Sequence, residues 1–264
     1  MSATRLIRGL PSRAALSPWG VPLALLVLWQ LSAQLGWLSA RILPSPWSVA
    51  KSAWQLTLSG ELPQHVKVST LRALSGFAVG GGLGLALGLA TGSSRRAELL
   101  LDGTVQMIRN IPPLALIPLV IVWFGIEETA KLFLVSIGVF FPMYVNTFHG
   151  IRSVDRGLIE MARSYGLQGW ALYRDVILPG ALPSILVGVR FSLGFMWVIL
   201  IVAETLSAQA GIGYMTMNAR EFLQTDVVLL GILLYALLGK LADAVARALE
   251  ARWLRWNPAY RVAA

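Results

Sequence analysis

The residue types that carry out catalysis or bind metals are scarce in this sequence. There is no cysteine, and the two histidines, His65 and His149, lie far apart along the chain. Disulfides and Cys/His metal sites therefore have almost nothing to build from. No cluster of acidic residues, histidine and a nucleophile stands out, and the phosphate-binding pattern G-x-x-x-x-G-K-[ST] is missing. We expect no catalytic residue, no metal site and no cofactor bound by the chain itself.

Charged side chains instead gather in one polar stretch, from Val154 to Gly180. Charges are expensive in hydrocarbon, so this stretch lies outside any bilayer. Apolar residues recur at helical spacing on both sides of Gly166, which predicts two short amphipathic helices broken at this glycine and stopped by Pro179. Such a bent outcrop suits a soluble partner, and the alternative is a helix pair resting on its own bundle or on lipid headgroups. The charged residues are Asp155, Arg156, Glu160, Arg163, Arg174 and Asp175.

The overall composition is that of an integral membrane protein. The 264 residues are 56% hydrophobic and 13% charged, with a mean hydropathy of +0.67, whereas soluble proteins carry about 25% charged residues. The net charge of +9 suggests nucleic acid, but cations that flank apolar spans explain it through the positive-inside rule. We therefore expect membrane lipid around the chain and no nucleic-acid partner.

Apolar runs long enough to cross a bilayer predict an all-α polytopic bundle with six transmembrane helices. A lead (1–18) precedes a single transmembrane domain (19–248), and a basic tail (249–264) follows it. A short external helix is expected from Trp47 to Leu58, and an external re-entrant or capping segment from Leu206 to Thr225. The predicted spans are Trp19–Leu38, Ser69–Thr91, Leu99–Gly125, Leu132–Phe148, Pro183–Thr205 and Asp226–Arg247.

Glycines recur every four residues along the second predicted span. Gly76, Gly80, Gly84 and Gly88, followed by Gly92, form one ribbon. Small residues at this spacing let another helix approach the backbone closely, so the ribbon predicts a packing seam rather than a lipid-facing surface. Its partner is either another helix of the same bundle, which we favour, or a second copy of the chain.

Six spans place both termini on one side of the membrane, and charge indicates which side. Most Lys and Arg residues outside the spans lie on the side of the termini and of the polar stretch. Cytoplasmic loops carry such an excess of cations. Both termini and the polar stretch are therefore expected in the cytoplasm.

The third predicted span is interrupted where polar groups accumulate. Arg109 and Asn110 come just before Pro112 and Pro113, two prolines that break the hydrogen-bond ladder of a helix. Free backbone groups at membrane depth are tolerated only against protein or a water-filled cavity. The segment is either part of a pathway through the membrane or an ordinary proline kink satisfied by neighbouring helices.

The polar stretch resembles the EAA loop of the permeases of binding-protein-dependent ABC importers. The pattern of that loop is Glu-Ala-Ala, three residues, Gly, nine residues, Ile, any residue, Leu-Pro. The matching residues here are Glu160, Ala162, Gly166, Leu178 and Pro179, with Met161 in place of the first Ala and Val176 in place of the Ile.

Nearly the whole chain looks like the permease subunit of the aliphatic sulfonate importers, and related branches carry taurine, nitrate or a thiamine precursor. The resemblance implies a homodimer in the bacterial inner membrane, a cytoplasmic ABC ATPase dimer that binds ATP and Mg, and a periplasmic sulfonate-binding protein. It also implies roles in the coupling loop (154–180). Glu160 and Arg163 are rim contacts with the ATPase, Ala162 and Gly166 allow close approach and the bend, and Pro179 ends the lever rigidly.

An alkanesulfonate is an anion with an apolar tail, so its pathway is expected to carry mild positive potential without a tight site. Arg190, in the fifth predicted span, is the best candidate, with Arg109 and Asn110. The alternative for Arg190 is a structural role, in which it snorkels or pairs with another helix. Glu204, near the far end of that span, is expected to cap or to form a salt bridge at the outer face.

Two other classes of function are weighed against the importer. An ion-driven secondary transporter is expected to have inverted repeats and paired carboxylates in the middle of the membrane. A membrane-embedded enzyme needs a catalytic cluster. By eye the sequence has no such repeat and no such cluster, and acids within the spans are nearly absent.

Overall fold

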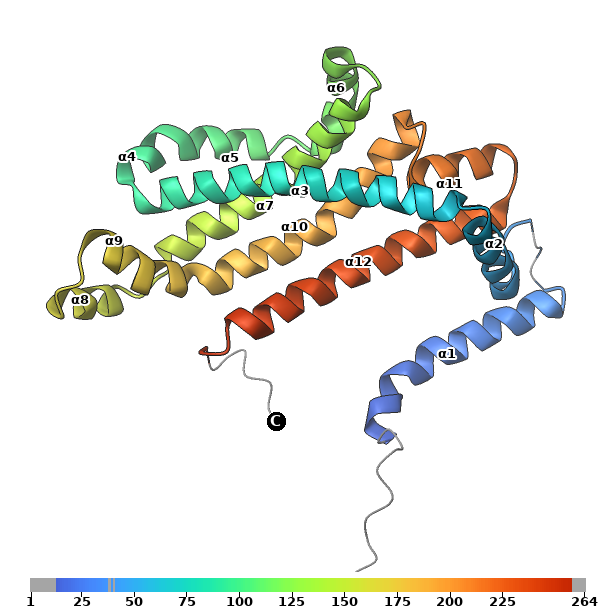
Figure 1. Ribbon diagram of the computed structural model, residues 1–264, viewed down its shortest axis with the longest axis horizontal. Coiled ribbons are helices and arrows are strands. Elements are labelled where there is room, and N and C mark those ends of the chain that lie inside the picture. The colour runs from blue at the N-terminus through green and yellow to red at the C-terminus, as the bar shows by residue number, and fades with distance from the viewer. Residues whose placement is uncertain (1–12, 38, 40, 258–264) are drawn as a thin grey trace, which may run out of the picture.

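The computed structural model describes residues 13–37, 39 and 41–257, which form helices with no strand among them (Figure 1). The predicted all-α membrane bundle is confirmed. In chain order the elements are α1 (Arg13–Gln34), α2 (Pro46–Leu58), α3 (Glu61–Ser93), α4 (Arg95–Ala97), the π-helix η1 (Glu98–Asp102), α5 (Gly103–Arg109), the 3-10 helix η2 (Pro113–Leu116), α6 (Ile117–Phe124), α7 (Glu128–Arg152), α8 (Arg156–Ser164), α9 (Gly169–Leu172), the π-helix η3 (Tyr173–Ile177), α10 (Leu178–Ser207), α11 (Ile212–Glu221) and α12 (Thr225–Trp253).

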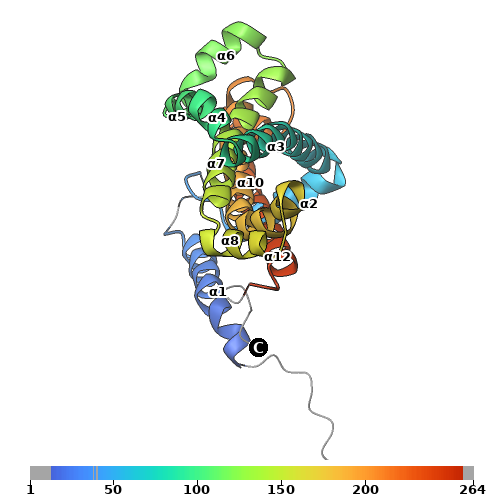
Figure 2. The ribbon, with the colours of Figure 1, turned by 90° about the vertical axis from the view of Figure 1, so that its left-hand side faces the viewer.

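Four long helices, α3, α7, α10 and α12, form the body of the molecule, and α1 leads away from it (Figures 1 and 2). Each of the four is long and apolar enough to cross a membrane. The segments Arg95–Arg109 and Pro113–Phe124 make a fifth crossing if this pair, bent by 81°, counts as one span. The apolar part of α1 (Gly20–Gln34) is shorter. A sixth crossing therefore stays a prediction.

Predicted span boundaries differ from the helices at the N-terminal end of the chain. The first predicted span runs from Trp19 to Leu38, whereas α1 runs from Arg13 to Gln34 and Leu38 lies outside the described residues. The second predicted span begins at Ser69, whereas its helix, α3, begins at Glu61, directly after Gly60 at φ +80°. Hydropathy marks only the part of a helix that matches hydrocarbon, and polar turns continue the same helix beyond it.

The glycine ribbon of α3 lies against α7 of the same chain. A Cβ atom on Gly84 would lie 2.5 Å from the carbonyl oxygen of Phe140. A Cβ on Gly88 would lie 2.7 Å from the Cβ of Thr147. Only the hydrogen of a glycine side chain fits in this seam, so the two helix backbones approach closely. In lipid, this close van der Waals packing is what holds the two helices together. In the same way Gly76, Gly80 and Gly92 meet Val135, Ser136 and Ile151.

Two prolines that the sequence places at helix boundaries do not interrupt the chain. Pro179 is the second residue of α10, directly after the π-helix η3, and the backbone stays helical across it. The π-helix η3 joins α9 directly to α10, and Pro183 lies inside α10. The prediction that Pro179 stops the second short helix is therefore wrong, because the helix continues through it, while its role at the end of the lever stays a prediction.

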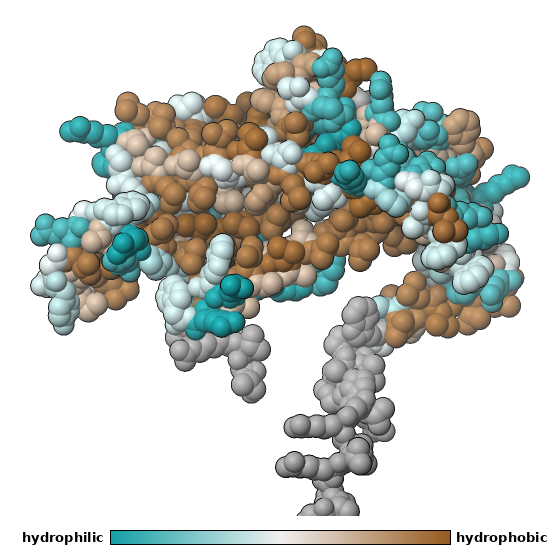
Figure 3. Space-filling model, in the orientation of Figure 1, coloured by the Kyte–Doolittle hydropathy of each residue, from teal (hydrophilic) through white to brown (hydrophobic). Residues whose placement is uncertain are grey.

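An apolar surface covers the middle of the molecule. Brown residues extend along α3, α10 and α12 in the face shown in Figure 3, while teal residues gather towards the two ends. On α12, Leu233, Leu237 and Leu241 are 45%, 65% and 59% exposed. Exposed apolar area on this scale matches lipid rather than water.

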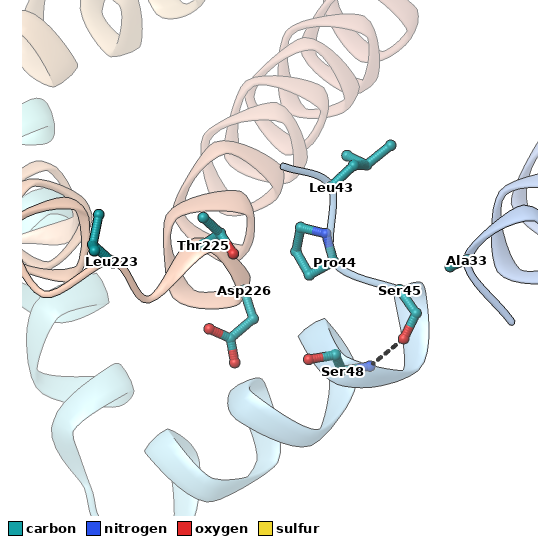
Figure 4. Close-up of a pocket in the computed structure, with 8 residues that line it drawn as sticks. All are labelled: Ala33, Leu43, Pro44, Ser45, Ser48, Leu223, Thr225 and Asp226. Atoms are coloured by element: carbon teal, nitrogen blue, oxygen red, sulfur yellow. Dashed lines mark hydrogen bonds between the residues drawn. The ribbon is translucent and has the colours of Figure 1, made fainter. Parts of the chain in front are cut away.

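The predicted external helix is present as α2, which is tied to the start of α12. The Ser45 hydroxyl accepts a hydrogen bond from the N–H of Ser48 at 3.2 Å and so caps α2. The Ser52 hydroxyl donates to the carboxylate of Asp226. A pocket of about 300 Å³ lies at this junction, between α1, α2 and the loop before α12 (Figure 4).

Candidate functional site

The helix pair α8–α9 protrudes at one end of the bundle (Figure 1). Asp155 caps α8, because its Oδ1 accepts a hydrogen bond from the N–H of Gly157 at 2.8 Å. The helix is followed by Gly166 at φ +87°, a conformation that favours glycine. The N–H of Leu167 donates to the carbonyl of Ala162 at 3.0 Å, which closes a Schellman turn. Local sequence thus sets both the length of α8 and the bend after it.

One face of α8 exposes an apolar stripe, the α8 stripe, formed by Leu158, Met161 and Tyr165. Their exposed fractions are 48%, 52% and 83%. Ala162, next to Leu158 on the side of the helix that turns towards the bundle, is buried. Apolar side chains that stay exposed on a protrusion mark an interaction surface. The spacing of the stripe is visible in the sequence, but only the structure shows which side of α8 faces the bundle.

The predicted coupling residues are spread around this protrusion. Glu160, Arg163 and Gly166 are exposed, and neither charged residue has an ion pair within the described part of the chain. Leu178 and Pro179 are half-buried at the start of α10. Their parts in coupling stay predictions.

A small apolar cluster anchors the protrusion to the membrane helices. Ile151, Val154, Ala181 and Ile185 are buried together, and Ile159 of α8 packs against them. These residues come from the end of α7, the following turn, the start of α10 and α8. Force applied to α8 is therefore transmitted to the ends of two long helices, because packed side chains leave little free volume to absorb it.

At the opposite end of the bundle, Glu204 of α10 is at the centre of a buried polar network. Its carboxylate accepts hydrogen bonds from the Ser69 hydroxyl at 2.8 Å and from Arg72 Nη1 at 2.7 Å, both on α3. The N–H of Gly213 donates at 2.9 Å and the Tyr235 hydroxyl at 3.0 Å. The carboxylate therefore links α3, α10, α11 and α12.

Arg72 extends this network to α7. Its Nε and Nη2 donate to the two carboxylate oxygens of Glu128, both at 2.5 Å, a bidentate geometry that suits guanidinium. Lys131 lies 3.6 Å from the same carboxylate. Two cations thus balance Glu128 and Glu204. The expectation of a salt bridge at Glu204 is confirmed, but its side chain is fully buried between helices.

The predicted pathway residues lie in three different environments. Arg190 donates to Asp243 at 2.8 Å and lies 3.6 Å from Glu250, both on α12. Arg190 therefore fits the alternative given from the sequence, a structural role in which it pairs with another helix. Asn110 donates to the carbonyl of Gln106 and so caps the end of α5. Arg109 lines a groove between α5, α7 and α10.

Comparison with known proteins places most of this architecture in one family. Residues 80–255 match the family model described as the binding-protein-dependent transport system inner membrane component. That stretch contains the α8–α9 protrusion, the Arg109 groove and Glu204.

Individual relatives extend the similarity over almost the whole chain. The putative aliphatic sulfonates transport permease protein SsuC of Escherichia coli (strain K12) is 64% identical, over 93% of this chain and 94% of that protein. The protein of the same name from Bacillus subtilis (strain 168) is 46% identical over 91% of this chain and 87% of its own. The taurine transport system permease protein TauC of Escherichia coli (strain K12) is 37% identical over 90% of this chain and 88% of its own.

Proposed function

The chain belongs to the binding-protein-dependent transport system inner membrane component family, and from this premise we propose that it imports aliphatic sulfonates as the permease subunit of an ATP-driven transporter. It is a multi-pass membrane protein. The observation that carries the substrate class is the high identity to the aliphatic sulfonates permease along nearly its whole length. The taurine permease is much less similar, so an alkanesulfonate without the amino group is favoured over taurine.

In this proposal the chain hydrolyses nothing itself. Two copies form the membrane core, a cytoplasmic ATPase dimer binds ATP and Mg, and a periplasmic binding protein delivers the sulfonate. Both termini and the α8–α9 protrusion face the cytoplasm, as the distribution of Lys and Arg supports. Closure of the ATPases then moves the protrusions, and alternating access follows from a rigid-body change between the two copies.

The exposed surface of α8 supports this coupling role. Each ATPase holds one protrusion in a surface groove, where the α8 stripe supplies apolar contact. Glu160 and Arg163 are exposed on another face of α8, form no ion pair among the described residues and supply charged groups for the rim of that interface. The buried contact between Ile159 and the ends of α7 and α10 passes the movement to the membrane helices.

A growth test checks the proposal directly. The chain is expressed with its ATPase and binding protein in a bacterial host that lacks its own sulfonate uptake, with an alkanesulfonate as the sole sulfur source. We expect growth and ATP-dependent uptake of labelled alkanesulfonate. A host that grows on sulfate but neither grows on nor accumulates any alkanesulfonate would refute the proposal. Growth on taurine alone would shift the assignment to the taurine branch.

A further inference from the structure

The groove that contains Arg109 is formed by three segments that are distant in sequence. Arg109 lies at the end of α5, Phe141 and Asn146 on α7, and Phe191 and Phe195 on α10, around a cavity of about 320 Å³. Ligand pockets in proteins begin at about this volume. The lining combines one guanidinium group and one amide with three aromatic rings.

The groove lies along the membrane-crossing parts of α7 and α10. At 1.5 Å per residue, Gly138, which also lines it, is about 15 Å along α7 from Glu128. Phe195 is about 18 Å from the Ser207 end of α10. The hydrocarbon core is about 30 Å thick. Asn146, the lining residue nearest the other end of α7, is about 9 Å from Arg152, so the groove extends from the middle of the span towards that end.

Two interrupted helices border this groove. The chain between Arg109 and Pro113 has left α5 and not yet entered the next helix. On α7, Pro142 lies inside the helix and lines the groove, so the carbonyl of Gly138 loses its usual N–H partner. Unpaired backbone groups at this depth are tolerated only beside protein or water. Both interruptions therefore fit a groove bordered by protein and open to water.

Arg109 differs from the other arginines within the helix bundle. Arg72 and Arg190 each contact two carboxylates. Arg109 is exposed and forms no ion pair among the described residues. A cation at membrane depth without a partner is costly and marks a functional site by default. Its missing counter-charge is that of an anionic ligand.

We propose that this groove is a transient binding site for the alkanesulfonate during its passage, an inference that rests on the proposed function. The guanidinium of Arg109 donates hydrogen bonds to the sulfonate oxygens, as it does to other planar or tetrahedral oxyanions. The alkyl tail lies against Phe141, Phe191 and Phe195. The single cation and the open side of the groove keep the affinity low enough for release.

Uptake by the complete importer in proteoliposomes tests the anionic end of this site. Arg109→Gln should reduce alkanesulfonate uptake by about tenfold or more, because a charge-assisted hydrogen bond is lost. ATP hydrolysis stimulated by the binding protein should persist. Arg109→Lys should recover part of the uptake. The control is Arg96→Gln, the same charge change at an exposed arginine without an ion pair among the described residues, which should change uptake by about twofold at most.

The apolar end of the site has its own readout, the dependence on tail length. Phe191 is 60% exposed, so Phe191→Ala should fold normally. It should lower uptake of pentanesulfonate about fivefold or more, and that of methanesulfonate about twofold at most, because a longer tail loses more apolar contact. Val198→Ala, at a 52% exposed position of α10 outside the groove, should treat both substrates alike.

Three results would overturn the assignment. Normal uptake by Arg109→Gln would remove the arginine from the path. Equal losses for both tail lengths in Phe191→Ala would mean that lipid fills the groove, and a loss of dimer mass in that variant would mean that a second copy covers it. A wild-type importer that carries no sulfonate refutes the proposed function instead, so the two failures are distinguishable.

Discussion

Glu204 shows how much can depend on one residue of this chain. Glu204→Gln removes the charge that balances Arg72 while keeping the shape of the side chain. Breaking one side of a buried ion pair costs about 3 kcal/mol, so the purified protein should melt several degrees lower in detergent. Glu221→Gln, at an exposed position of α11, should leave the melting temperature unchanged. Equal melting temperatures for both variants would mean that the network adds no stability.

Arg190 provides a second test at the residue scale. Its two carboxylate partners on α12 balance its charge, so Arg190→Gln should lower stability by about 1 kcal/mol, the value of a partly exposed pair. Sulfonate uptake should persist in proteoliposomes. If uptake falls while the melting temperature stays unchanged, Arg190 is part of the substrate pathway and the structural role is contradicted.

Sequence alone identified residues of unusual type at unusual depth but not their partners. Glu204 and Arg190 stand out because acids and cations are rare inside apolar spans. Arg72 and Tyr235 did not, because their relation to Glu204 depends on how α3 and α12 pack. Arg72 is 132 positions from Glu204 and Tyr235 is 31 positions from it, separations that no local spacing can reveal.

At the scale of elements, the seam between α3 and α7 makes a sharp prediction. A Cβ on Gly80 would overlap the backbone of Ser136, whereas a Cβ on Gly82 meets nothing within 4 Å. Gly80→Ala should therefore push the helices apart. Overpacking should reduce the free energy of unfolding by about 1–3 kcal/mol, which is measured as a lower melting temperature. Gly82→Ala is the matched control on the same helix and should be neutral. Helix propensity favours alanine at both positions, so similar losses in the two variants would show that close packing at the seam is not the cause.

The α8 stripe makes a prediction about assembly. Truncation of Leu158 and Met161 together to alanine should release the ATPase during purification, since interface energy concentrates in a few apolar contacts. The control pair is Leu237→Ala with Leu241→Ala, two exposed apolar residues of α12. Retention of the ATPase by the stripe variant would locate the coupling interface elsewhere.

Helix positions were easier to predict than helix ends. The all-α bundle and the bend at Gly166 follow from hydropathy and from a glycine that the backbone requires at positive φ. The expected stop at Pro179 is wrong, because η3 runs directly into α10 and the backbone stays helical across the proline. The π-helix η3 before it leaves no signature that the sequence pattern can show.

At the scale of the whole molecule, the orientation in the membrane is open to direct measurement. The chain has no cysteine, so single cysteines can be introduced without a background. Arg163→Cys should react with a membrane-impermeant thiol reagent only from the cytoplasmic face, and Arg220→Cys, at an exposed position of α11, only from the opposite face. Reaction of the Arg163→Cys variant from outside would contradict both the orientation and the coupling role.

The two ends of the bundle differ in how they are held. Packing of apolar side chains around Ile151 and Ile185 secures the end beside α8 and can slide by small steps. Around Glu204, by contrast, moving one helix alone separates a buried carboxylate from its donors, at a cost of about 1–3 kcal/mol for each group left unsatisfied. We therefore expect the helix ends at Glu204 to move together, with any pivot that opens the passage between subunits or nearer the protrusion.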